Sequence, residues 1–493
     1  MTLRIYNTMT RHKEDFQPLQ EGRVGIYVCG ITAYDYCHAG HARSAVVFDV
    51  ITRYLRYRGY EVTYVKNFTD LDDKIIARAK AEGRDFSEIA NRYIAACNED
   101  MDALGVLRPT VSPRATENID DMLRHIGRLI DKGAAYAVDG DVYFAVDRFP
   151  AYGKLSGREL EDMMAGARVD ISDSKKNPFD FALWKASKEG EPWWDSPWGR
   201  GRPGWHIECS AMSSHYLGAA FDIHGGGHDL IFPHHENEIA QSEGATGESF
   251  ANYWIHNGFV RINDEKMSKS LGNIFTIRDM LKSYHPEVIR FFLLSSHYRS
   301  PVDFSDGQLA EARLAMERFY KTRKALKDGL AGGPDLSGID VDRLGGKDRE
   351  LMDRIEALPQ RFAEAMDDDF NTPRALAALF ETVRHVNAFL AERKEPLSVE
   401  SLFVLNEASS ALGDVGAVLG LFREDPDAYF RSDLIRQAGK QEIDVAMIEE
   451  LIAERWQARL AKNWQRADEI RAILSEKRII LKDGPTATSW KID

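Results

Sequence analysis

The sequence lacks the features that mark membrane, exported or disordered proteins. No run of about 18 apolar residues occurs along its 493 residues, so no membrane-spanning helix is expected. Residues 1–13 carry charges and no apolar core, which argues against a secretory signal and favours a cytoplasmic protein. Low-complexity tracts and internal repeats are missing too. With 44% hydrophobic and 29% charged residues, the composition is that of a globular chain.

Cysteine is scarce, and neither sign of charge dominates. Cys29, Cys37, Cys97 and Cys209 are too few and too scattered for a disulfide framework, so free thiols or metal ligands in a reducing compartment fit better. Cys37 and Cys97 belong to no motif and are expected to be ordinary buried residues. Asp and Glu outnumber Lys and Arg, 78 to 64, for a net charge of −14. This balance argues against a protein that coats nucleic acid non-specifically, but it allows an RNA partner on a local basic face.

Alternating strand and helix signals predict a doubly wound parallel-sheet (Rossmann-like) α/β domain. Residues 24–29 form a short apolar run typical of a buried strand, 42–58 have helical apolar spacing, and 61–65 are β-rich. This strand–helix–strand order is a βαβ unit. Prolines punctuate the following region, and strand–helix alternation resumes near residue 205. Beyond about residue 310, segments rich in Leu, Ala, Glu and Arg predict helices.

These patterns divide the chain into five parts. We expect the first half of the α/β domain in 1–110, a connective insertion in 111–200, the second half in 201–310, a helical bundle in 311–430 and a small C-terminal module in 431–493.

Two histidines stand at the start of the first predicted helix. His38 and His41 flank Gly40 just beyond the carboxyl end of a strand, where ligands bind in open α/β sheets. A helix N-terminus attracts phosphate, Gly40 allows close approach to the backbone, and imidazoles can donate to phosphate oxygens. By itself the loop fits two solvated histidines equally well.

A second loop, residues 266–273, combines two lysines with two serines. Lys266 and Lys269 can place mobile positive charges on a polyphosphate during attack at phosphorus. A short basic loop alone is also typical of a charged surface. Together with the histidine loop it is stronger evidence, because both loops follow strands of one α/β domain.

Two of the cysteines form a candidate metal site with a histidine and a glutamate. His234 and Glu238 are four residues apart on a predicted helix that starts at a proline, so they share a face. Cys29 ends the first strand, and Cys209 lies near the start of another helical stretch. Thiolate and imidazole ligands favour zinc over magnesium or calcium. Spacing alone fits buried, apolar cysteines better, and His235 rivals His234.

These motifs resemble the class I aminoacyl-tRNA synthetases, with residues 38–41 as the HIGH signature and 266–270 as KMSKS. More narrowly, the chain is similar to the cysteinyl-tRNA synthetase family in residues 28–32, 67–74, 204–210, 222–227 and 232–238. Ala39 replaces the usual Ile, and His228 stands where a small polar residue is expected. The resemblance implies an enzyme that ligates L-cysteine to the 3′ end of its tRNA through a cysteinyl adenylate.

The resemblance also implies site residues. Catalysis would fall to His38, His41, Lys266 and Lys269. ATP, with Mg²⁺, would contact His38, Gly40, His41, Gly227, Asp229 and Lys269. Cysteine would contact Gly30, Thr32, Thr69, Trp205 and His224, although His224 fits a core histidine equally well. One zinc ion per chain would be held by Cys29, Cys209, His234 and Glu238 and would select a thiol over a hydroxyl.

The C-terminal part is expected to bind tRNA, including its anticodon, and the protein is expected to be a monomer. Basic residues from Arg455 to Lys482 would contact phosphates, and Trp464 or Trp490 would stack on a base. Two alternatives remain. A ligase joining cysteine to an amino sugar would share every catalytic motif but lack this long region. A catalytically dead RNA-binding relative is disfavoured by the intact His38 and Lys269.

Overall fold

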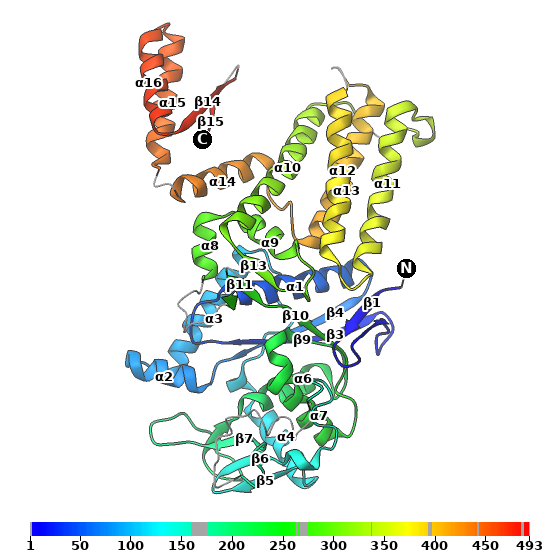
Figure 1. Cartoon of the computed structure of the whole chain (residues 1–493), viewed down its shortest axis with the longest axis vertical. Helices are drawn as coiled ribbons and strands as arrows, with labels where there is room; N and C mark the ends of the chain where they lie inside the picture. Colours follow the sequence, from blue (N-terminus) through cyan, green and yellow to red (C-terminus); the bar gives the residue numbers. More distant parts are fainter. Residues whose placement is uncertain are drawn as a thin grey trace.

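The computed structural model describes residues 2–158, 175–262, 265–266, 275–336, 338–392, 397–440, 443–484 and 488–492. Its central feature is a parallel sheet of order β10-β9-β3-β4 (Figure 1). The strands are β3 (Arg23–Thr32), β4 (Glu61–Thr69), β9 (Phe221–Gly227) and β10 (Ala251–Asn257). The predicted parallel α/β domain is therefore confirmed, and β3 and β4 each run several residues past their predicted ends.

Both faces of this sheet are buried. Val24, Ile26 and Val28 of β3 pack on the side of α1 (Ala39–Tyr57). The alternate residues Tyr27 and Cys29 pack on the opposite side. There they meet α6 (Trp205–Leu217) and α7 (Glu236–Thr246), which lie below the sheet in Figure 1. Burial on both faces explains why the strand is one continuous apolar run.

The pairing of β3 with β4 is interrupted at Cys29 and Gly30. Its register shifts between Val28 and Ile31, a bulge of the kind that turns side chains toward a site. The Gly30 N–H donates to Asn67 Oδ1 at 2.8 Å. A Cβ on Gly30 would lie 1.5 Å from the Asn67 carbonyl oxygen, so only glycine fits.

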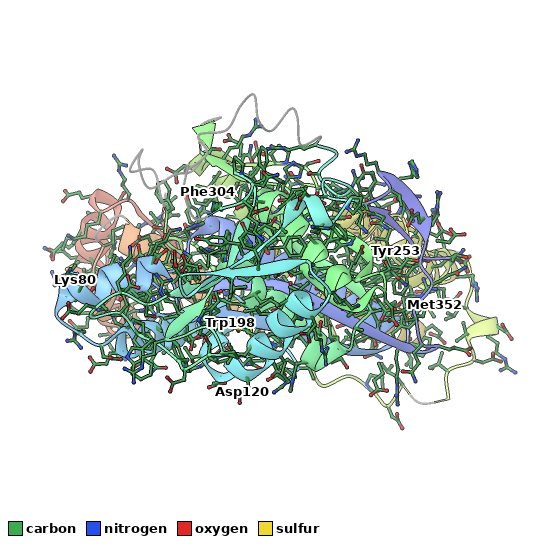
Figure 2. The ribbon with its side chains drawn as sticks, turned by 90° about the horizontal axis from the view of Figure 1, so that it is seen from below. Lys80, Asp120, Trp198, Tyr253, Phe304 and Met352 are labelled. Carbon is green, nitrogen blue, oxygen red and sulfur yellow. The ribbon has the colours of Figure 1, made fainter. Side chains whose placement is uncertain are left out.

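A second small sheet lies between β4 and β9 in the chain. Its strands are antiparallel in the order β5-β6-β7-β8, and they share a core with α4. Seen from below, this part lies in front of the parallel sheet, where Asp120 and Trp198 are labelled (Figure 2). Along the chain, β4 is followed by α2 (Asp73–Glu82) and α3 (Phe86–Ala103). The small sheet and its helix then consist of α4 (Ile119–Asp131), β5 (Ala135–Val138), β6 (Asp141–Phe144), β7 (Phe181–Ala186) and β8 (Gly201–Pro203).

An irregular turn, Ile231–His235, leads directly into α7. It is kinked at Phe232, which is extended (φ −140°, ψ 132°), whereas the residues from Pro233 onward have helical φ/ψ and run into α7 at Glu236. Proline disfavours the helical conformation in the residue before it, which explains the kink. The helical stretch predicted from Pro233 is therefore present, and His234 and His235 lie in the turn that immediately precedes α7.

Helices dominate the rest of the chain. A bundle stands above the sheet, and α14 joins it to a small terminal module (Figure 1). The bundle consists of α10 (Asp306–Leu330), α11 (Gly346–Met366), α12 (Thr372–Glu392) and α13 (Val399–Leu419). The module follows α14 (Pro426–Lys440) and consists of α15 (Val445–Leu460), α16 (Trp464–Glu476), β14 (Ile479–Asp483) and β15 (Thr488–Ile492).

Short elements complete the described chain. They are β1 (Arg4–Asn7), β2 (His12–Asp15), β11 (Val260–Ile262), β12 (Glu265–Lys266), α8 (Ile277–Ser283), α9 (Pro286–Leu294) and β13 (Val302–Phe304).

Within the described residues, α13 alone is long and apolar enough to cross a membrane, and half of its apolar window is buried. A core helix of a bundle meets the same test, so this is weak evidence for a membrane span.

A buried ion pair joins α1 to α9. Arg290 donates to Asp49, and both side chains are fully buried. Arg290 Nε also donates to the Leu419 carbonyl at the end of α13, 2.6 Å away. Arg53 donates to Asp49 at 2.9 Å and to the Ala417 carbonyl at 3.1 Å. These contacts fasten the bundle to the sheet domain.

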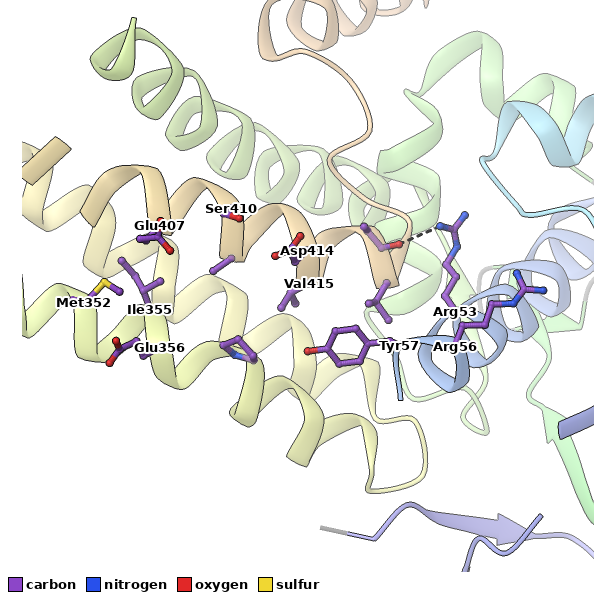
Figure 3. Close-up of a pocket in the computed structure, with 14 residues that line it drawn as sticks. Arg53, Arg56, Tyr57, Met352, Ile355, Glu356, Glu407, Ser410, Asp414 and Val415 are labelled. Carbon is purple, nitrogen blue, oxygen red and sulfur yellow. Dashed lines mark hydrogen bonds between the residues drawn. The ribbon is translucent and has the colours of Figure 1, made fainter. Parts of the chain in front are cut away.

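A cavity of about 600 Å³ lies at this junction, between α1, α11 and α13. Arg53 and Tyr57 reach it from α1, whereas Met352 and Val415 line it from the bundle (Figure 3). It lies apart from every residue that the motifs single out.

Replacing Arg290 by Met should weaken the attachment of the bundle. Among the residues that the structure describes, Arg53 would remain as the only cationic partner of the buried Asp49, so we expect a loss of about 3 kcal/mol in the free energy of unfolding. Urea unfolding followed by circular dichroism measures this loss. Arg84→Met, which breaks an exposed pair with Glu88, is the control and should change stability by less than about 0.5 kcal/mol. Equal losses in the two variants would contradict the assignment.

Gly30→Ala should disrupt the bulge, because its new Cβ would overlap the Asn67 carbonyl. Gly25→Ala on the same strand is the matched control, since its Cβ would meet only ordinary contacts from 3.5 Å outward. We expect Gly30→Ala to lower the free energy of unfolding by about 2 kcal/mol or more, as overpacking does. Gly25→Ala should lower it much less. Thermal unfolding of both variants checks this, and an unaltered Gly30→Ala protein would contradict it.

Candidate functional site

The structure brings Cys29, Cys209, His234 and Glu238 together, with one possible ligand atom of each within 4.8 Å of all the others. The two Sγ atoms are 3.6 Å apart, and Cys29 Sγ lies 3.2 Å from Glu238 Oε1. His234 Nε2 is 3.0 Å from the same oxygen. The four side chains come from β3, α6, the irregular turn and α7, and all are buried. Their closeness means that the four side chains could hold a metal ion.

The electrostatics of the cluster favour a cation. Burial and the neighbouring Cys209 raise the pKa of the Cys29 thiol. Burial also opposes ionisation of Cys209, but hydrogen bonds with Cys29 and His234 outweigh it and lower its pKa to about 6. The buried Glu238 has a lowered pKa because His224 and His234 face it. The lowered pKa values of Cys209 and Glu238, with the raised pKa of the His234 imidazole that faces Glu238, favour two negative charges and one positive charge in a buried space, and a bound divalent ion would balance them.

A second set of possible ligands overlaps the first. Cys29, His224, His235 and Glu238 also place their ligand atoms within 4.8 Å of one another. His224 Nε2 lies 2.8 Å from Glu238 Oε2, and His235 Nε2 lies 4.0 Å from Glu238 Oε1. The second set has one thiol instead of two, and His235 is farther from the shared carboxylate. These contacts favour His234 over its rival His235.

Two side chains to which sequence reasoning gave no role contact the cluster or a residue beside it. His206 Nδ1 lies 2.8 Å from His234 Nδ1, which orients the His234 ring with Nε2 toward Glu238. Glu208 accepts a hydrogen bond from Thr69 Oγ1 at 2.8 Å, and burial raises the pKa of this carboxyl. His206 and Glu208 precede Cys209 by three residues and one residue. Their place in residues 204–210, the segment that contains the candidate ligand Cys209, could have pointed to them.

The residues expected to contact cysteine surround this cluster. Gly30 and Thr32 lie at the carboxyl end of β3, and Thr69 ends the neighbouring β4. The Trp205 ring lies 4.2 Å from the His234 ring and is 41% exposed, so it covers the cluster toward solvent. His224 is fully buried with its Nε2 on Glu238, so it contacts the cluster from inside the sheet.

The first histidine motif forms the start of α1. His38 Nδ1 accepts from the Gly40 N–H at 3.1 Å, and His41 Nδ1 accepts from the His38 N–H at 3.1 Å. The two rings stack 3.9 Å apart. Ala39 is fully buried, which suits a packing position. Both imidazoles therefore lie at a helix N-terminus, where an anion is stabilised.

Neighbouring strands bring the remaining nucleotide residues to the same edge. Because β3 and β9 are adjacent and parallel, the end of β9 at Gly227 lies beside the end of β3. Asp229 follows in an exposed turn. His228 is exposed as well, and its ring lies 5.7 Å from Phe259, edge to face. The carboxyl ends of β3 and β9 thus place the two segments predicted to bind ATP, residues 38–41 and 227–229, at the same edge of the sheet.

The second motif is only partly described. Lys266 belongs to β12, and Lys269 lies outside the described residues. The chain that follows packs on the histidine loop: the Ala39 N–H donates to the Phe275 carbonyl at 3.1 Å, and the Ile277 N–H donates to the Cys37 carbonyl at 2.9 Å. The segment adjoining the lysine motif therefore lies against the histidine motif.

Known proteins resemble the chain over its full length. A model of the class I (C) tRNA synthetase catalytic domain matches residues 15–314, and a DALR domain model matches 361–423. The cysteine–tRNA ligase of Geobacter sulfurreducens is 57% identical over 492 residues, and that of Trichlorobacter lovleyi is 56% identical over 492 residues. Each alignment covers 100% of both chains.

Solved structures show the same fold at low identity. Mycobacterium tuberculosis methionyl-tRNA synthetase superposes with a TM-score of 0.59 at 16% identity, covering 83% of this chain and 93% of that one. Thermus thermophilus arginyl-tRNA synthetase has a TM-score of 0.54 at 13% identity, covering 85% of each chain. The motifs, the parallel sheet and the full-length matches agree, and the chain belongs to the cysteine–tRNA ligases of the class I tRNA synthetases.

Proposed function

We propose that the protein attaches L-cysteine to the 3′ end of its tRNA through a cysteinyl adenylate, with zinc selecting the substrate thiol. The observation that carries the zinc assignment is the buried quartet of Cys29, Cys209, His234 and Glu238 within one ion's reach. Two sulfurs, one nitrogen and one oxygen form a donor set that suits zinc.

Cysteine must be distinguished from serine, which is no larger and differs by one atom. A shaped apolar pocket gains only about 1–3 kcal/mol from such a difference. Zinc, when bound, supplies a soft Lewis acid that favours a thiolate over a hydroxyl. The chain contributes the position of that thiolate: Trp205 closes the cluster toward solvent, and Gly30 and Thr69 border it.

Activation then takes place toward the histidine loop. The cysteine carboxylate attacks the α-phosphate of Mg·ATP, a new carboxylate–phosphorus bond forms, and the bond to pyrophosphate breaks. His38 and His41 hydrogen-bond the phosphates at the start of α1, and Lys266 and Lys269 stabilise the negative charge on the leaving pyrophosphate. Gly227 and Asp229 hold the adenosine, the carboxylate accepting from ribose hydroxyls.

Transfer follows when the terminal ribose of the tRNA attacks the adenylate carbonyl and AMP leaves. Class I membership implies attack by the 2′-hydroxyl.

We assign tRNA binding to the helices after residue 310 and the terminal module. Arg455 is not available for phosphate there, because it is buried and forms two hydrogen bonds with Asp483 at 2.7 and 2.9 Å. Trp464, 58% exposed, is better placed to stack on a base than Trp490, which is partly buried and packs against the module's core.

The alternative of an amino-sugar ligase predicts a different acceptor. The DALR match at 361–423 and the long helical region favour tRNA. Parallel transfer assays with tRNA and with glucosaminyl inositol separate the two functions. Charging of tRNA alone supports the proposal, and rapid charging of the sugar alone overturns it.

Cys209→Ser should remove the metal and the thiol selectivity together. We expect zinc affinity to fall by about 100-fold or more and the KM for cysteine to rise severely, because a hydroxyl is a poor zinc ligand. Metal analysis and cysteine-dependent ATP–pyrophosphate exchange measure both changes. Cys97→Ser, a buried cysteine outside the cluster, is the control and should keep zinc and activity. Wild-type exchange by a zinc-free protein would refute this account of selectivity.

Lys269→Ala should slow adenylate formation far more than it weakens cysteine binding, because its charge acts on the departing pyrophosphate. We expect kcat in the exchange reaction to fall by about 100-fold or more with a nearly unchanged KM for cysteine. Single-turnover kinetics with labelled ATP provide the measurement. Lys282→Ala, at an exposed lysine paired with Asp279, is the control. A rise in KM with unchanged kcat would assign Lys269 to substrate binding instead.

A further inference from the structure

An arginine on α1 is buried two residues after the histidine motif. Arg43 has 1% of its surface exposed. Its Nη2 donates to the His297 carbonyl at 2.8 Å and to the Ser296 carbonyl at 3.3 Å. Both carbonyls follow α9 in the chain, so Arg43 fastens the start of α1 to the segment that leaves α9.

The rest of this guanidinium group lacks a partner. Arg43 Nε and Nη1 are buried, and they meet no hydrogen-bond acceptor among the residues that the structure describes. Burial lowers the pKa of Arg43 to about 10, and the side chain is still protonated at neutral pH. The equally buried Arg290 differs, because it is paired with Asp49. Since a buried charge without a counter-charge is costly, an acceptor is expected at the two remaining nitrogens of Arg43.

A small cavity lies against this side chain. Its volume is about 10 Å³, and its walls come from α1, the end of α9 and the start of α12: Arg43, Val47, Val50, Ile51, Leu294, Tyr298, Phe370 and Thr372. A space of this volume holds about one water-sized sphere. It therefore admits a water or a monatomic anion, and it excludes phosphate, sulfate and carboxylic acids.

The charge of the walls distinguishes between these two occupants. Arg43 is the one charged residue among the described walls. The Tyr298 hydroxyl donates to Asp369 at 2.7 Å, and Thr372 Oγ1 donates to a carbonyl of α9 at 2.8 Å. Asp369 also accepts from Arg299 Nε at 2.8 Å, so another cation already balances it. The cavity thus offers cationic donors without a carboxylate in its walls, which favours an anion over water.

We propose that this cavity binds one chloride ion, which accepts hydrogen bonds from Arg43 Nε and Nη1. The ion gives Arg43 the counter-charge that Asp49 gives to Arg290. Because the cavity walls join α1, the end of α9 and the start of α12, the bound ion stabilises the packing of these three segments. The site is separate from the candidate metal cluster and needs neither zinc nor a substrate.

Bromide identifies the site directly, because it replaces chloride and scatters X-rays anomalously near its absorption edge. The experiment uses crystals of the full-length protein soaked in sodium bromide. We expect an anomalous peak inside the cavity, within hydrogen-bond distance of Arg43 Nε and Nη1. A cavity that shows water and no anomalous peak would overturn the proposal.

Thermal unfolding measures the effect of the ion in solution. Sodium acetate replaces sodium chloride at constant ionic strength, since acetate is too large for the cavity. We expect the melting temperature of the wild-type protein to be about 2–4 °C higher in chloride. Val47→Ile adds a methylene group at the cavity wall while Arg43 stays in place, and it should lose most of this difference. Val46→Ile, the same change at a buried residue outside the wall, is the matched control and should keep it.

Arg43→Met removes the charge and should abolish the difference between the two salts. If this variant does not fold, Val47→Ile and the bromide-soaked crystals still decide. The proposal is overturned if wild-type protein melts at the same temperature in both salts. It is also overturned if Arg43→Met responds to chloride as wild type does, or if the two valine variants respond alike. No measurement here involves the charging of tRNA, so a failure of the proposed function leaves the test unaffected.

Discussion

The site depends on the burial of one carboxylate. Glu238 has no solvent to stabilise its charge, and an unpaired buried carboxylate is too costly for a fold to keep. His224 and His234 each contact one of its oxygens, and the Cys29 thiol donates to it. Each contact fixes a different segment: the middle of β9, the irregular turn before α7 and the bulge of β3. The same carboxylate thereby defines the space in which a cation and a substrate sulfur would meet.

The topology explains why sulfur recognition and nucleotide binding are neighbours. A single strand, β3, delivers Cys29 at its bulge and, a few residues later, His38 at the start of α1. Parallel pairing then brings the end of β9, with Gly227, to the same edge of the sheet. The sheet edge therefore places the candidate sulfur site beside the histidine loop, so one substrate could reach both.

Periodicity was sufficient to predict the parts of this arrangement that are local. The apolar run of β3 and the spacing in α1 identified the βαβ unit, and the chemistry of Cys29, Cys209, His234 and Glu238 identified a set that the structure brings together. Local pattern predicted the helical stretch from Pro233 but not the kink at Phe232 before it. It also failed for His206, whose ring nitrogen lies 2.8 Å from that of His234. That contact joins segments that approach only after the sheet has formed, and no spacing rule encodes it.

The neighbours of a cysteine determine its chemistry. Cys29 and Cys209 face a carboxylate and an imidazole, a donor set that a divalent cation would satisfy and that would hold both sulfurs as ligands. Cys97 is equally buried, but it lines a cavity wall with Lys66, whose ammonium cannot serve beside it as a metal ligand. The candidate metal site is therefore defined by the carboxylate and the imidazole beside the two sulfurs, because buried cysteine alone occurs elsewhere in the same fold.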